Sequence, residues 1–215
     1  MKTIILALLF VATSAFADCD HFYPNGKKIQ PFGATELCNV FYVTQYDDTN
    51  SRALFSSEFL SPGSHDVPRR DSFRGDSRVI HMVKPQAYYN SGYDKGHLVP
   101  ADDASNPEEM HSTFLMTNMT PQNPKLNRGA WRQLEENTQK MVNASGSPAI
   151  VVTGAMYEKD EMMGSVPIPS GYYKIIYLAG KKPVAYYANN NEKTRPRTVT
   201  VNWINAKTEL KFPKG

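Results

Sequence analysis

The segment from Tyr93 to Glu135 holds the densest set of side chains that could carry out chemistry. Within it, His97 follows a glycine and Lys95 lies two residues earlier. An imidazole with an unperturbed pKa of about 6.5 can take a proton from water near neutral pH, and the lysine could hold an anion. These groups suit phosphodiester hydrolysis, in which the attacking water must lose a proton. Taken alone, a histidine in a polar turn is more often a surface residue than a catalyst.

Asn127 and Glu135 could bind or position a divalent cation. Asn127 stands where a helical pattern begins, a position at which Asn is also common simply as a cap. Eight residues further on, Glu135 would lie about 80° round a regular helix and about 12 Å along it. Because Mg²⁺ keeps several of its waters, a direct contact from the Asn127 amide oxygen and a water-mediated contact from Glu135 are physically sensible. The ordinary alternative for Glu135 is a solvent-exposed helix carboxylate.

One amphipathic helix and several strands must position these residues. The helix is predicted over about residues 128–142, because apolar side chains recur there on one side, at Trp131, Leu134, Thr138, Met141 and Val142. Strands are predicted at residues 40–45, 149–153, 172–178, 184–187 and 198–203, with loops at 18–38, 61–76 and 102–109. This order predicts a mixed α+β fold on a largely antiparallel β-sheet core.

Composition excludes several classes and leaves the partner open. The 215 residues are 40% hydrophobic and 21% charged, unlike a disordered, coiled-coil or collagen-like chain. The formal charge of +3 does not point to nucleic acid, but its distribution is uneven: residues 94–112 hold five acids and one Lys, whereas residues 172–215 hold nine Lys or Arg and two Glu among several aromatics. The basic and aromatic residues at 172–215 could form a surface that binds a polyanion. They could equally well be the solvated edges of strands.

The N-terminus reads as an export signal. Residues 1–17 combine Lys2, an apolar run and a small-residue end at Ala17, which predicts cleavage before Asp18 and a secreted or periplasmic protein with no membrane attachment afterwards. The run is too short and too interrupted for a membrane-spanning helix. In an oxidising compartment the two cysteines, Cys19 and Cys38, are expected to form a disulfide that pins an arm at residues 18–38. A zinc site is the less favoured alternative, because no His lies at ligand spacing.

Three motifs then follow one another in a fixed order: DKGH at residues 94–97, TNMTPQ at 117–122 and LNRGAWRQLE at 126–135. In these motifs the chain resembles the DNA/RNA non-specific endonucleases of the ββα-metal type, a group that includes secreted bacterial nucleases and mitochondrial endonuclease G. The weaker resemblance extends over most of residues 18–215, which implies a single nuclease domain with a ββα-metal motif. The family more often has Arg where Lys95 stands, and Lys lacks the planar two-pronged grip on phosphate.

The resemblance implies a role for each matching position. His97 matches the general base, Asn127 the direct ligand of one Mg²⁺, and Glu135 the acid that positions metal-bound water. Mn²⁺ is a possible substitute for the metal. Asn118 matches a supporting amide in the active site, and Lys95 the cation of the first motif. The implied reaction cuts DNA and RNA with little sequence preference and leaves 5′-phosphate ends.

The sequence offers more than one candidate for the phosphate-binding arginine. Arg52 follows Ser51 in the segment Val43 to Phe59, which looks like the upstream arginine segment of the family, and Arg69 and Arg70 are nearby alternatives. Two other functions compete with a nuclease. A secreted nucleic-acid-binding protein with weak or no cleavage would need only a basic surface, and a hydrolase of another phosphodiester would not explain the basic and aromatic C-terminal third.

Overall fold

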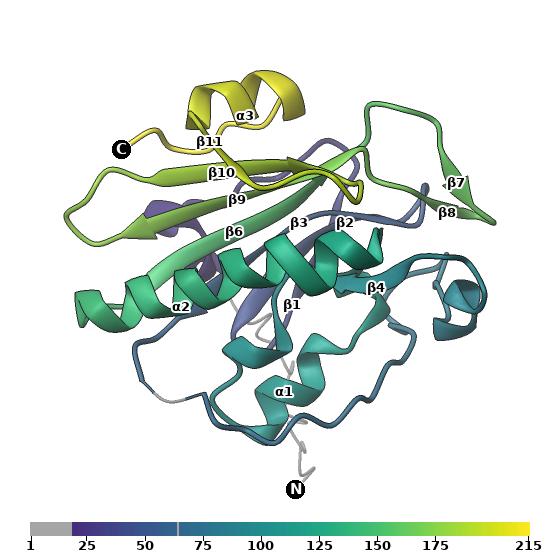
Figure 1. Ribbon diagram of the computed structural model, residues 1–215, viewed down its shortest axis with the longest axis horizontal. Helices are drawn as coiled ribbons and strands as arrows, with labels where there is room; N and C mark the ends of the chain where they lie inside the picture. The colour runs from purple at the N-terminus through teal and green to yellow at the C-terminus, as the bar shows by residue number, and fades with distance from the viewer. Residues whose placement is uncertain (1–18, 64) are drawn as a thin grey trace, which may run out of the picture.

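A seven-stranded antiparallel sheet forms the centre of the protein in the computed structural model, which describes residues 19–63 and 65–215 (Figure 1). Its strands lie in the order β1-β2-β3-β6-β9-β10-β11. Their bounds are β1 (Thr35–Cys38), β2 (Tyr42–Asp47), β3 (Arg52–Leu60), β6 (Ala149–Met156), β9 (Gly171–Leu178), β10 (Val184–Asn189) and β11 (Arg197–Val199). The predicted α+β fold on an antiparallel sheet is confirmed. The predicted signal peptide lies outside the described residues.

Two short strand pairs and three helices complete the fold. The pairs are β4 (Asp94–His97) with β5 (Met119–Gln122), and β7 (Met162–Met163) with β8 (Val166–Pro167). The helices are α1 (Pro107–Thr113), α2 (Arg132–Ser145) and α3 (Val201–Thr208). Among the described residues, no helix combines the length and the apolar character needed to cross a bilayer.

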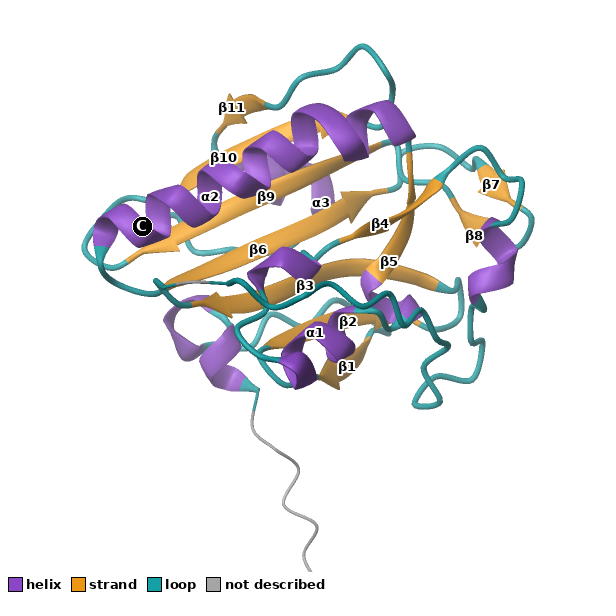
Figure 2. Ribbon diagram, turned by 60° about the horizontal axis from the view of Figure 1, so that its bottom comes forward, coloured by secondary structure: helices purple, strands orange, loops and turns teal. Residues whose placement is uncertain are grey.

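Both faces of the sheet are covered, which explains the apolar run in β9. Successive side chains of a strand point to opposite faces. Tyr172 therefore packs against Trp131 on the face covered by α2, whereas Tyr173 packs against Phe212 on the other face. Figure 2 shows α2 in front of β9 and β10 and α3 behind them. The predicted apolar side of the helix is confirmed, since Trp131, Leu134, Thr138 and Val142 are buried.

The three motifs form one β4–β5–helix unit. Strand β4 pairs with β5 in antiparallel register, so that Gly96 lies opposite Thr120 and His97 opposite Met119. Gly96 has no room for a side chain, because a Cβ there would clash with the Gln122 side chain. The packing of the Gln122 side chain against Gly96 therefore explains structurally why the first motif has a glycine and the second a glutamine at these positions.

The helix begins earlier and less regularly than its periodicity predicts. A π-helical turn, Leu126–Trp131, with a non-helical backbone at Gly129, precedes α2. Asn127 therefore lies within a widened turn and is not the cap of a regular helix. The angular and axial offsets that a regular helix would give between Asn127 and Glu135 do not apply across this turn.

Three other elements differ from the sequence-based expectation. The acidic stretch at residues 102–109 was expected to be a turn, but α1 begins there; Asn106 accepts from two backbone N–H groups and Pro107 occupies the first position. Residues 198–203 are not one strand, because the Thr200 side chain caps α3 at 3.1 Å from the Trp203 nitrogen. Strand β3 was missed, because buried polar residues interrupt its apolar pattern.

The predicted disulfide is present. Cys19 and Cys38 are bonded, with their Cα atoms 6.0 Å apart, and the bond occupies both sulfurs, so the zinc alternative is wrong. The arm that it pins is not only loop, since it includes β1. Phe22 and Tyr23 of this arm are buried in the core below α3.

Replacing both cysteines with serine should destabilise the protein without unfolding the sheet. Closing a loop of this size lowers the entropy of the unfolded chain and contributes about 3 kcal/mol. For a chain of this length we expect the midpoint of thermal unfolding to fall by roughly 6–12 °C. Calorimetry of the wild type and the double variant measures the difference. An unchanged midpoint would show that the bond does not constrain the unfolded state.

Candidate active site

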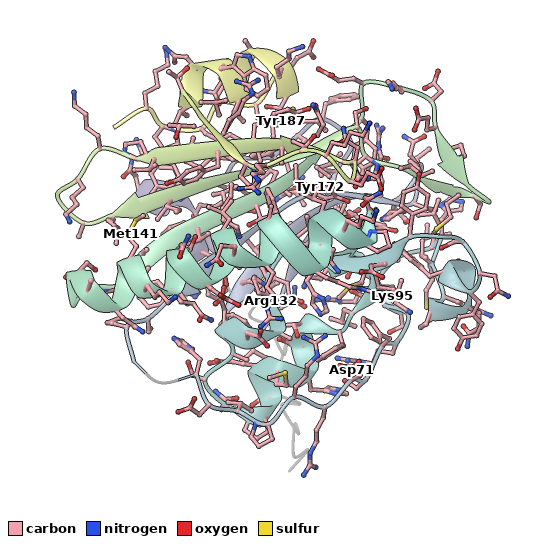
Figure 3. All side chains as sticks on the ribbon, in the orientation of Figure 1. Asp71, Lys95, Arg132, Met141, Tyr172 and Tyr187 are labelled. Carbon is pink, nitrogen blue, oxygen red and sulfur yellow. A yellow bond between two sulfur atoms is a disulfide. The ribbon has the colours of Figure 1, made fainter. Side chains whose placement is uncertain are left out.

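A cleft of about 460 Å³ opens where β4, the π-helical turn and the start of α2 meet the loop before β4. Of the residues predicted to act in the site, Lys95, His97, Asn127 and Glu135 line it together. Its wall also contains residues to which the sequence analysis assigned no role, namely Asp71, Phe73, Asp94, Asp102, Arg128 and Arg132, together with the alternative arginine Arg69. In Figure 3, Lys95, Asp71 and Arg132 are labelled around this region.

His97 is held between aromatic rings at the end of β4. Its ring centroid lies 5.1 Å from that of Phe114, edge to face, and 5.9 Å from that of Phe73. Nε2 is buried and has no hydrogen-bond partner among the described residues. Burial, with a smaller contribution from the positive charge of Arg69, lowers the pKa of His97 to about 3. The imidazole is therefore neutral at every pH near neutrality.

The low pKa of His97 predicts that its ring stays neutral at pH 5. In the unfolded chain the same ring has a pKa of about 6.5. Between pH 6.5 and pH 3 the imidazole is therefore protonated in the unfolded chain and neutral in the folded protein. The contribution of His97 to stability therefore decreases as the pH falls through this window. An NMR titration, with the His97 resonance assigned by its loss in His97→Ala, measures the midpoint. A midpoint near 6.5 would contradict the burial argument.

The side-chain amide of Asn127 is oriented by Asp94, the first residue of the DKGH motif. Asn127 Nδ2 donates to Asp94 Oδ2 at 2.9 Å. Arg128 also donates to Asp94, from Nε at 2.8 Å and from Nη2 at 2.5 Å. With its nitrogen committed to Asp94, the Asn127 amide presents its oxygen on the opposite side, as a ligand of a hard cation requires.

Acidic side chains line the cleft together with Asn127. Burial raises the pKa of Glu135 to about 8; the charge of Lys174 opposes this rise, and those of Asp103 and Asp102 add to it. Glu135 and Asp102 both line the cleft with Asn127. The amide oxygen of Asn127 and the carboxyl oxygens of Glu135 and Asp102 are hard oxygen donors of the kind that Mg²⁺ or Mn²⁺ prefers. The residues present therefore fit a divalent cation.

Lys95 is positioned by aromatic rings. Its Nζ lies 4.8 Å from the ring centroid of Phe73, 5.7 Å from that of Tyr88 and 6.0 Å from that of Tyr89. Cation–π attraction holds the ammonium in this cage at the edge of the cleft. The rings restrict the flexible lysine, which otherwise lacks the fixed geometry of an arginine fork.

Asn118 lies behind the cleft and does not line it. Its Oδ1 accepts from the Val99 nitrogen at 3.0 Å and from Ser56 Oγ at 3.2 Å. Its Nδ2 donates to the carbonyls of Val99 and Thr113, each at 3.0 Å. These four bonds satisfy a fully buried amide and fix the chain just after His97. Asn118 is thus placed to support the site from within the core.

The structure places Arg52 away from the cleft and Arg69 in it. Arg52 Nε bonds Asp47 Oδ2 at 2.9 Å, and its guanidinium stacks 4.8 Å from the Tyr157 ring centroid. Arg69 lines the cleft with His97, and its Nη1 lies 3.8 Å from Asp102 Oδ1. Arg69 lies in a loop without regular secondary structure. No helical or strand periodicity in the surrounding sequence therefore indicated that its side chain would line the cleft.

The basic and aromatic C-terminal third is not one surface. Tyr172, Tyr173 and Tyr187 are core residues, and Lys174 is 1% exposed with its Nζ 2.5 Å from Thr153 Oγ1. The exposed cations are divided among the β9–β10 turn, the loop before β11 and the C-terminal segment around α3. In the loop before β11, at residues 190–196, Arg195 and Pro196 line a hollow together with α2.

Residues 25–215 match the family model described as DNA/RNA non-specific endonuclease. The chain belongs to that family. A nuclease of Serratia marcescens is 36% identical over 204 residues, which cover 87% of this chain and 76% of that protein. A nuclease of Nostoc sp. is 37% identical over 143 residues, and human mitochondrial endonuclease G is 30% identical over 155 residues. Each of these two alignments covers 64% of this chain and 52% of the relative, so this endonuclease-family chain matches about half the length of both.

The fold agrees with the family. A chain in the crystal structure of the EndoG/EndoGI complex superimposes with a TM-score of 0.72 at 24% identity, over 82% of this chain and 84% of that chain. This similarity shows a shared fold. The β4–β5–helix unit has the two antiparallel strands followed by a helix that the resemblance implied for residues 94–135.

Proposed function

We propose that this member of the family is a metal-dependent endonuclease that hydrolyses DNA and RNA with little sequence preference. The observation that carries the proposal is the convergence of His97, Asn127 and Glu135 on one cleft that also contains the cations Lys95 and Arg69. A protein that only bound nucleic acid would need the cations but not a neutral imidazole beside a cation-binding amide. Cations that contact phosphates carry no sequence information, which agrees with broad specificity.

His97 acts as the general base in this proposal. Because Nε2 is buried, Nδ1 is the ring nitrogen that we assign to the attacking water. The water gives its proton to His97 and its oxygen attacks phosphorus, while the bond from phosphorus to the 3′ oxygen breaks. The leaving oxygen takes a proton from solvent, which yields a 3′-hydroxyl and a 5′-phosphate.

The remaining residues bind the cation and the phosphate. Asn127 would hold Mg²⁺ through its amide oxygen, with Glu135 orienting water of the ion; Mn²⁺ could replace it. When bound, the ion offsets negative charge on the phosphate and on the leaving oxygen. Arg69 is the arginine that we assign to the phosphate in place of Arg52, because it lines the cleft, and Lys95 assists it. Asn118 positions His97 through the chain that follows it.

We also propose that residues 1–17 are a cleaved signal and that the mature chain acts in a periplasm or outside the cell. The support is the apolar N-terminal run and the Cys19–Cys38 disulfide, which requires an oxidising compartment to persist. Detection of mature chains that begin at Asp18 in the exported fraction would test this. Recovery of uncleaved protein in the cytosol would contradict it.

Incubation of the mature protein with plasmid DNA and with RNA, in Mg²⁺ and in chelator, tests the function. We expect internal cleavage of both polymers only with the metal, and ligatable 5′-phosphate ends. Binding of either polymer without cleavage would favour the nucleic-acid-binding alternative. Cleavage of small phosphodiesters alone would favour a different hydrolase.

A further inference from the structure

A second hollow of about 670 Å³ runs beside α2 and continues from the cleft. One wall is the π-helical turn and α2, from Arg128 to Met141, and the other is formed by Arg195 and Pro196 of the loop before β11. Arg128 and Arg132 line both hollows, so the two are contiguous at the first turns of the helix. Figure 3 labels Arg132 and Met141, which mark the extent of this groove along α2.

We infer that this groove binds the polynucleotide strand beyond the bond that is cut, so that long substrates bind more tightly than short ones. The inference rests on the proposed nuclease function, because the strand must first occupy the cleft. It adds Arg195, a residue outside the three motifs, as a contact that determines preference for substrate length.

Charge selects the occupant. The groove wall contains Arg128, Arg132 and Arg195 and a single acid, Glu136, which pairs with Arg132 Nε at 2.9 Å; Arg128 pairs with Asp94 of the adjoining cleft. In the described part of the chain, Arg195 makes no ion pair, and its side chain is exposed. A guanidinium in this position is available to a phosphate of a passing strand. The floor contains the half-buried Tyr186, against which sugars and bases can pack.

The wall that carries Arg195 is anchored to the catalytic unit. The Asn190 side chain accepts from the Asn123 nitrogen at 2.7 Å and donates to the Pro121 carbonyl at 2.9 Å, both next to the end of β5. Glu192 bonds Lys125 Nζ at 2.7 Å, just before the π-helical turn. These contacts fix the loop relative to β5, the strand that pairs with the His97 strand β4. The groove is therefore formed before any substrate binds.

The groove is long enough to matter for affinity. The nine steps from Arg132 to Met141, all within α2, correspond to about 14 Å of helix at about 1.5 Å per residue. A strand in duplex geometry advances about 3.4 Å per nucleotide, so about four nucleotides would fit beside α2. A substrate of about four nucleotides, centred on the cleft, would leave most of the groove empty.

Kinetics of Arg195→Gln on single strands of about four and about thirty nucleotides test the inference. For the long strand we expect the variant to raise KM about three- to tenfold, with kcat unchanged, and to reduce the slope of log KM against log salt by about one. For the short strand we expect wild-type KM and kcat. Lys27→Gln is the matched control, because Lys27 is an exposed cation before β1, at the other edge of the sheet; its kinetics should equal the wild type on both strands.

Each other outcome overturns the inference. If Arg195→Gln keeps the wild-type KM and salt slope on the long strand, the groove does not hold nucleic acid and is free for another occupant, such as an acidic polypeptide. If the variant loses activity equally on both strands, Arg195 acts in the cleft and not along the groove. Absence of cleavage of either strand by the wild-type protein would instead contradict the proposed function, which keeps the two failures distinguishable.

Discussion

Replacement of His97 by alanine is expected to abolish nearly all cleavage while leaving nucleic-acid binding measurable. A positioned general base contributes about 10²–10⁴-fold to rate, and no other imidazole lines the cleft among the described residues. The cations Arg69 and Lys95 remain in the variant, so affinity for DNA should change by less than about threefold. Initial rates on plasmid and a filter-binding isotherm without metal measure the two quantities separately.

Controls for this variant address packing and specificity. Because the ring contacts Phe73 and Phe114, alanine leaves a gap; His97→Asn keeps a side chain of similar size and should lose the same activity. The matched control is His81→Ala, since His81 is exposed and outside the cleft; it should cleave like the wild type. Wild-type turnover in both His97 variants would show that another group deprotonates the water.

The second large effect is expected at Asn127. Asn127→Ala removes the amide oxygen that we assign to the cation and leaves Asp94 without its bond to the amide nitrogen, so we expect no cleavage at Mg²⁺ concentrations that saturate the wild type. Direct Mg²⁺ binding by calorimetry should weaken in parallel, which separates loss of the ion from misfolding. Asn202→Ala, at an exposed asparagine of α3, is the matched control and should bind and cleave normally.

Asp94→Asn tests how the amide of Asn127 is oriented. An amide at position 94 can donate as well as accept, so it no longer fixes which end of Asn127 faces the cleft. Loss of such a supporting contact typically weakens metal binding about 10–100-fold. We therefore expect Asp94→Asn to need more Mg²⁺ for half-maximal rate but to approach wild-type rate when saturated. An unchanged Mg²⁺ requirement in both variants would contradict Asn127 as the ligand.

Local patterns explain which elements could be predicted. Trp131, Leu134, Thr138 and Val142 recur with helical period because one side of α2 packs on the sheet, and the apolar run of β9 reflects burial on both faces. The apolar pattern did not predict β3, because polar residues are buried in that strand. At Thr200 the β-propensity of the segment predicted a strand, but the residue caps a helix. The start of α1 carried a readable signal in Asn106 and Pro107, which acidic composition obscured.

By itself, the sequence predicted most of the candidate site. His97, Asn127 and Glu135 belong to motifs that lie close together in the chain, and the prediction of the Cys19–Cys38 bond used only the two cysteines and the predicted export signal, so short-range information was sufficient. Only the tertiary structure decided that Arg69 and not Arg52 lines the cleft, that Lys174 is buried, and that the loop at residues 190–196 forms a groove with α2. Each of these facts depends on contacts between segments far apart in the chain, which no local pattern of residue types encodes.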